Sequence, residues 1–151
     1  MTEDAKPVAA LDLRARSVRT LAWLGDADFE REVRRRVVAR GDYPVDRLDA
    51  VKALVVRAES QAALLAAIEG ELEEDERSLV RRARNQSPRS GGRVQRDTRA
   101  YRSATALEAL VGLWFHGGEP GPTRFEALLG ARIEAAIDAA LAVAGARIRR
   151  G

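Results

Sequence analysis

The sequence contains no cysteine and a single histidine, His116, among its 151 residues. These absences exclude disulfide bonds, zinc fingers and cysteine nucleophiles, and they argue against a histidine-based metal site. No apolar run approaches the roughly 20 residues of a membrane-spanning helix, and the short acidic N-terminus is not followed by a signal-type apolar core. We therefore expect a cytoplasmic protein without a membrane segment.

Strand patterns are also missing, because apolar and polar residues nowhere alternate over a strand-length run. Apolar residues instead recur at helical spacing, so the sequence predicts an all-α fold. Residues 46–69 are consistent with one helix or with two helices broken near Arg57. The expected helices span residues 18–40, 46–69, 73–85, 98–116 and 123–148.

The charge is unevenly distributed, although the net charge is only +3. Between Arg81 and Arg102 there are eight arginines and one acid, Asp97. Residues 86–96, which contain Pro88 and two glycines, are expected to form a loop. A charge run is often only a solvated surface, but a basic segment of this density indicates phosphate binding and hence a nucleic acid.

Two carboxylates occupy unexpected positions. Asp26 falls on the apolar side of the first helix, and Glu108 lies in the middle of an apolar face of the helix at 98–116, with Tyr101 on the same face. We expect both side chains to point inward. A buried carboxylate is costly unless it is paired, hydrogen-bonded or metal-bound, so each either pairs with an interior arginine or shares a divalent cation such as Mg²⁺ with the other.

Three blocks surround these carboxylates in a recognisable order. Residues 21–27 read Leu-Ala-Trp-Leu-Gly-Asp-Ala, residues 81–85 read Arg-Arg-Ala-Arg-Asn, and residues 101–112 read Tyr-Arg-Ser-Ala-Thr-Ala-Leu-Glu-Ala-Leu-Val-Gly. The set resembles the ribonuclease III catalytic domain, and more closely its short bacterial form, Mini-ribonuclease III. The resemblance covers roughly residues 17–145.

The resemblance implies a homodimeric endoribonuclease for double-stranded RNA that depends on Mg²⁺, for which Mn²⁺ can substitute. Asp26 and Glu108 would be the catalytic metal ligands, and cleavage would leave a 5′ phosphate and a 3′ hydroxyl. The family also implies maturation of the large-subunit ribosomal RNA precursor. We expect residues 1–151 to form one ribonuclease III-like catalytic domain, with a lead-in at 1–16 and no separate double-stranded-RNA-binding domain.

Further site candidates follow from the resemblance and the charge pattern. Full-length ribonuclease III has acids where this chain has Ala22 and Thr105, so few protein ligands remain and Glu30 becomes a possible outer-shell ligand; its alternative is an ion pair with Arg34. The candidates for RNA contact are Arg81, Arg82, Arg84, Asn85, Arg89, Arg93, Arg96 and Arg102.

Both tryptophans fit the inner helix faces poorly, so Trp23 and Trp114 are candidates for a subunit interface. Tyr101 has either a core role or an RNA role, and His116 has no expected catalytic role. Two other functions remain open at this point. One is a non-catalytic RNA-binding or ribosome-assembly protein with the same fold, and the other is a helical DNA-binding protein.

Overall fold

The computed structural model describes residues 12–86 and 98–149. All regular structure in these two ranges is helical, which confirms the predicted fold class. The elements are η1 (Leu13–Ala15), α1 (Val18–Arg40), α2 (Val45–Val56), α3 (Ala58–Ile68), η2 (Glu69–Glu71), α4 (Glu74–Arg84), α5 (Thr98–His116), α6 (Gly121–Phe125), η3 (Glu126–Gly130) and α7 (Ala131–Arg149).

Helix α1 begins and ends where the sequence predicts. The Ser17 side chain accepts a hydrogen bond from the backbone N–H of Thr20 at 3.2 Å, as expected of an N-cap residue. The helix ends at Arg40, just before Gly41. Its inner face consists of the buried residues Val18, Leu21, Gly25, Phe29, Val33 and Val37.

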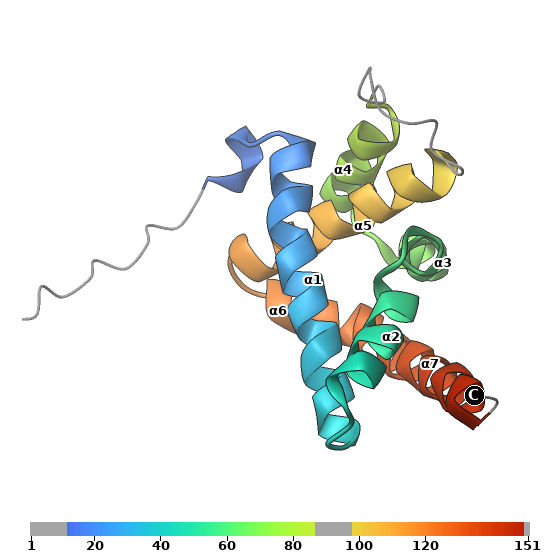
Figure 1. Ribbon diagram of the computed structural model, residues 1–151. Helices are drawn as coiled ribbons and strands as arrows, with labels where there is room; N and C mark the ends of the chain where they lie inside the picture. The colour runs from blue at the N-terminus through green and yellow to red at the C-terminus, as the bar shows by residue number, and fades with distance from the viewer. Residues whose placement is uncertain (1–11, 87–97, 150–151) are drawn as a thin grey trace, which may run out of the picture.

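Helices α1 and α5 cross with their backbones in contact (Figure 1). A Cβ atom added to Gly25 would lie 1.7 Å from the carbonyl oxygen of Glu108, and one added to Gly112 would lie 2.5 Å from the carbonyl oxygen of Leu21. No side chain fits at either position, so the two glycines permit this close approach. The crossing places Asp26, the residue after Gly25, beside Glu108, one turn before Gly112.

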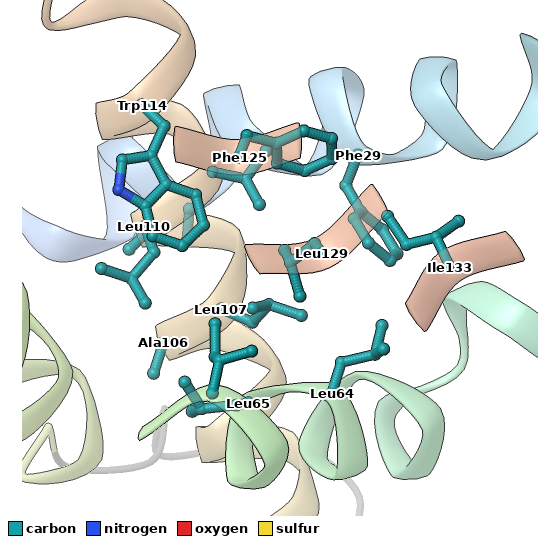
Figure 2. Packing of buried hydrophobic residues seen from close by; sticks show 14 of the residues in the cluster. Phe29, Leu64, Leu65, Ala106, Leu107, Leu110, Trp114, Phe125, Leu129 and Ile133 are labelled. Carbon is teal, nitrogen blue, oxygen red and sulfur yellow. The ribbon is translucent and has the colours of Figure 1, made fainter. Parts of the chain in front are cut away.

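The main core fills the space between α5 and the elements around it (Figure 2). Phe29 of α1, Leu65 of α3 and Phe125 of α6 are at most 1 % exposed. The rings of Phe115 and Phe125 are 4.8 Å apart, and Trp114 meets Phe125 edge-on at 6.4 Å. Aromatic pairs in these arrangements add to the stability that comes from buried area alone.

A buried ion pair joins α4, α5 and α6. Glu76 is only 4 % exposed and accepts hydrogen bonds at 2.6 Å from the Trp114 indole N–H and from Arg124. Burial alone would raise the pKa of Glu76, but these hydrogen bonds and one from the backbone N–H of Glu73 outweigh burial and lower it. The predicted interface position of Trp114 is therefore wrong, because this side chain is 3 % exposed within the core.

Helix α4 is also more deeply packed than its many charges suggest. Besides Leu79, the side chains of Glu76, Val80 and Ala83 are buried, whereas most of the other residues of α4 are exposed. Four successive acids, residues 73–76, lie at the start of α4. Two of them, Glu73 and Glu76, form a capping box there.

Two helix boundaries depart from a simple reading. The segment 46–69 contains two helices, because Arg57 adopts an extended conformation between α2 and α3. The expected single helix at 123–148 is instead three elements, since α6 starts at Gly121 and the π-helical turn η3 separates it from α7. Of the five apolar positions that helical spacing places on one face of this segment, Phe125, Leu129, Ile133 and Ile137 are buried, and Leu141 is only partly buried.

Ion pairs fasten the C-terminal half of α1 to η3 and α7. Arg36 contacts Glu126 at 2.5 Å and Glu134 at 3.0 Å, while Arg40 contacts Glu134 at 2.6 Å and also pairs with Asp138.

Among the residues that the structure describes, no helix is long and apolar enough to cross a membrane.

Replacing Gly25 with alanine tests the α1–α5 contact. Because the new methyl group would overlap backbone atoms rather than a flexible side chain, the helices must separate. We expect Gly25→Ala to lower the free energy of unfolding by about 2 kcal/mol or more in urea titrations. Gly70→Ala is the matched control, since a Cβ there has no atom within 4 Å, and it should change stability by less than about 0.5 kcal/mol. Equal effects would contradict this role of Gly25.

Candidate active site

Asp26 and Glu108 meet where α1 crosses α5. Asp26 is exposed and Glu108 is half-buried, so the expectation that both carboxylates point inward is wrong for Asp26. The reason is that Gly25, not Asp26, faces α5 at the crossing. The adjacent Asp26 consequently projects from the rim of the contact, while Glu108 lies deeper beneath it.

The environment of Glu108 disfavours its negative charge. Burial raises the pKa of Glu108 to about 7. A hydrogen bond from the Gln61 amide opposes this shift, and the negative charge of Asp26 adds to it. The two acids are therefore close enough to repel each other when both are ionised.

The alternative of a structural pair with an interior arginine is not what the structure contains. Within residues 12–86 and 98–149, no lysine, arginine or histidine forms an ion pair with Asp26 or Glu108. In the same ranges, no group of three His, Asp or Glu side chains could hold a metal ion by itself. A cation at this site would rely on two carboxylates and complete its coordination with water or substrate oxygens.

Glu30 lies one turn after Asp26 and is held by two cations. Its carboxylate is 3.1 Å from Lys52 Nζ and 3.6 Å from Arg34 Nη2. The hydrogen bond from Lys52 lowers the pKa of Glu30 despite partial burial. The ion pair with Arg34, the alternative to an outer-shell role, is thus present, and Lys52 adds a second positive charge beside Glu30.

Gln61 belongs to the site although the sequence analysis did not select it. Its side chain is 2 % exposed, and its Nε2 donates to Glu108 Oε1 at 3.1 Å. The signal was an amide on the apolar stripe of the helix that also carries Leu65. A buried polar side chain needs partners, but one sequence does not show that the partner comes from α5.

The candidate RNA-binding residues have differing surroundings. Arg81 pairs with Glu74 at 3.1 Å and Arg84 pairs with Glu69, whereas Arg82 is exposed. Asn85 is the C-cap residue of α4 and is also exposed. The Nε atom of Arg102 is buried and has no hydrogen-bond partner in the described part of the chain. Arg89, Arg93 and Arg96 lie outside the described residues.

The ring-bearing candidates Tyr101, Trp23 and His116 differ in their exposure and contacts. Tyr101 is 53 % exposed, so its expected place on an inner face is wrong and a core role is excluded. Trp23 is 79 % exposed on α1. His116 contacts Asp28 at 2.7 Å, which ties the C-terminal end of α5 to α1.

Comparisons with known proteins identify the family. A model of the Ribonuclease III domain matches residues 19–118, a span that contains both Asp26 and Glu108. The chain belongs to the ribonuclease III domain family. This result confirms the resemblance and the predicted class of enzyme, an endoribonuclease.

Similar proteins include several named Mini-ribonuclease 3. One from Desulfitobacterium hafniense is 42 % identical over 63 % of this chain, a match that spans 59 % of that relative's length. One from Symbiobacterium thermophilum is 39 % identical over 66 % of this chain and 76 % of its own. A crystal structure of a Fusobacterium nucleatum protein matches with a TM-score of 0.66 and 29 % identity, covering 83 % of this chain and 98 % of that chain.

The raised pKa of Glu108 predicts a pH-dependent stability difference between the parent and Glu108→Gln in chelator. The folded-state pKa of about 7 exceeds the unfolded value of 4.5, so between these pH values the folded state binds more protons. The parent therefore loses stability as the pH rises through this window. The variant should match the parent near pH 4.5 and be more stable above pH 7, by on the order of 2 kcal/mol.

Chemical denaturation at several pH values measures this difference. Glu59→Gln, which removes the same charge from an exposed position on α3, is the control and should track the parent. If the stability of Glu108→Gln and that of the parent changed in parallel with pH, the raised pKa of Glu108 would be refuted.

Proposed function

We propose that this protein is a Mg²⁺-dependent endoribonuclease that cleaves double-stranded RNA, with Asp26 and Glu108 as its catalytic metal ligands. The observation that carries the proposal is the pair of neighbouring carboxylates, which no cation of the described chain neutralises. Their oxygen donors are the kind that Mg²⁺ prefers, and Mn²⁺ can replace it. A bound divalent ion would remove the repulsion between them, so the residues present fit the ion.

The two acids differ in what they contribute to this chemistry. When bound, Mg²⁺ supplies Lewis-acid activation of water and stabilises negative charge on the scissile phosphate. Half-buried Glu108 gives a fixed ligand, and exposed Asp26 gives one that is open to solvent and substrate. The family resemblance implies that hydrolysis would leave a 5′ phosphate and a 3′ hydroxyl.

The substrate proposal follows from the surrounding charge. A-form RNA is recognised mainly through its shape, phosphates and 2′-hydroxyl groups, which suits exposed arginines such as Arg81 and Arg82 of α4. We propose the large-subunit ribosomal RNA precursor as the natural substrate, and consequently a cytoplasmic location.

A cleavage assay on duplex RNA tests the function directly. The parent should cut in Mg²⁺ and not in chelator, while Asp26→Asn and Glu108→Gln should each lose at least about 100-fold in rate. Asp28→Asn is the matched control on the same helix, because Asp28 faces His116 instead of Glu108, and its rate should stay near that of the parent.

The same assay, combined with binding measurements on duplex RNA and duplex DNA, separates the alternatives. RNA binding without cleavage by the parent would favour the non-catalytic RNA-binding protein. Tighter binding to duplex DNA than to duplex RNA would favour the DNA-binding protein. If Asp26→Asn or Glu108→Gln still cut RNA, the assignment of these residues as metal ligands would be wrong.

We further propose that the predicted arginines bind RNA phosphates without taking part in the chemistry. Replacing Arg89, Arg93 and Arg96 with alanine should weaken binding and reduce the steepness of its salt dependence by about 2 to 3, because fewer counterions are released. Cleavage at saturating RNA should persist. In the control variant, three arginines of α1, α2 and α7 are replaced with alanine instead, namely Arg35, Arg47 and Arg132. An equal reduction in the control would contradict a specific RNA contact.

We also propose a symmetric homodimer that uses the exposed face of α1 around Trp23. Two sites related by a two-fold axis would allow one particle to cut both strands of a duplex. A large aromatic side chain that is 79 % exposed suits an interface better than a monomer surface. Light scattering should give a dimer mass for the parent and a monomer mass for Trp23→Glu.

Val45→Glu provides the matched control for the dimer, since Val45 of α2 is 72 % exposed. This variant should remain dimeric. A monomeric parent at micromolar concentration would count against the dimer. A Trp23→Glu variant that stays dimeric would place the interface elsewhere, and loss of the dimer in both variants would contradict a specific role of Trp23.

A further inference from the structure

Gln61 connects the corner between α2 and α3 to the candidate metal site. Its Nε2 donates to the carbonyl oxygen of Val56 at 2.7 Å and to Glu108 Oε1 at 3.1 Å. Val56 is the last residue of α2, where carbonyl groups lack partners within the helix. Both amide N–H groups of Gln61 are therefore used, one to fix the amide itself and one to hold Glu108.

This arrangement suits a group that orients a metal ligand. An amide N–H bonds a carboxylate without competing as a metal ligand, and the bond from Gln61 engages only Oε1 of Glu108 and not Oε2. The donor comes from an amide that is 2 % exposed and anchored to the backbone. Glu108 is thereby restrained although it lies on a different helix.

A purely structural role explains this residue less well. The Gln61 Oε1 atom is buried and has no hydrogen-bond partner in the part of the chain that the structure describes. A buried acceptor without a partner lowers stability, and an apolar side chain would avoid that loss among neighbours such as Leu64 and Leu65. The corner is also closed independently, because Ser60 Oγ donates to the carbonyl oxygen of Leu54 at 2.6 Å.

We propose that Gln61 is a positioning residue that holds the Glu108 carboxylate in the conformation that binds the catalytic divalent ion. The proposal rests on the function proposed above. It assigns to an α3 residue a role in metal affinity that the motifs around Asp26 and Glu108 do not contain.

Mn²⁺ binding to the full chain without RNA provides the test, with free Mn²⁺ followed by electron paramagnetic resonance. Gln61→Met removes both amide donors while preserving the length of the side chain. It should raise the Kd for Mn²⁺ by about 10- to 100-fold, the usual range for losing a partner of a metal ligand. In cleavage assays, the Mg²⁺ concentration for half-maximal rate should rise in the same proportion.

Two further variants separate positioning from folding. Ser60→Ala removes the neighbouring hydrogen bond at the same corner without touching Glu108, and it should leave the Kd for Mn²⁺ within about 2-fold of the parent. Gln61→Leu repeats the test with a differently shaped apolar side chain, in case Gln61→Met folds poorly. In a Glu108→Gln background, Gln61→Met should have no further effect on Mn²⁺ binding.

Each outcome has a distinct meaning. An unchanged Kd in folded Gln61→Met or Gln61→Leu would overturn the proposal, and so would an equal loss in Ser60→Ala. A parent that binds no Mn²⁺ at millimolar concentration would instead contradict the metal site itself. The last result is distinguishable because it appears before any residue is replaced.

Discussion

The contact between the backbones of α1 and α5 is the constraint on which the rest of the structure depends. Gly25 and Gly112 let the two helices approach until side chains no longer fit between them. Asp26 follows the first glycine and Glu108 precedes the second by one turn, so the same contact brings the two acids together. The packing of the fold and the geometry of the site thus have one origin.

The remaining elements hold this crossing in place through charges as well as apolar packing. Glu76 and Arg124 form a buried, hydrogen-bonded pair that joins α4 to the end of α5 and to α6. Such a pair stabilises only if its hydrogen bonds are complete, and the Trp114 indole and a backbone N–H complete those of Glu76. The acids of the site differ because they have no equivalent cation partner in the described residues.

The sequence was sufficient for features that depend on local pattern. The helical spacing of apolar residues predicted a helix at 18–40, which is the observed extent of α1. The sequence was insufficient where contacts between residues far apart in the chain determine whether a side chain is buried. Glu76 reads as one of four successive acids at a helix start, and only its contact with Arg124, 48 residues later, explains its burial. The inward orientation assigned to Asp26 failed because a helical projection does not show that a neighbouring glycine makes the closest contact.

The close crossing also affects how divergence within this family can be read. Gly25 and Gly112 are required by packing, whereas Asp26 is exposed and Glu108 pays a penalty for its position. A descendant under no selection for activity could therefore discard either acid and still fold, but it could not easily discard the glycines. Under the proposed function, relatives that keep both glycines without the acids would have the same architecture and no cleavage activity. The glycines are thus tied to the fold itself, and the acids to the chemistry proposed for it.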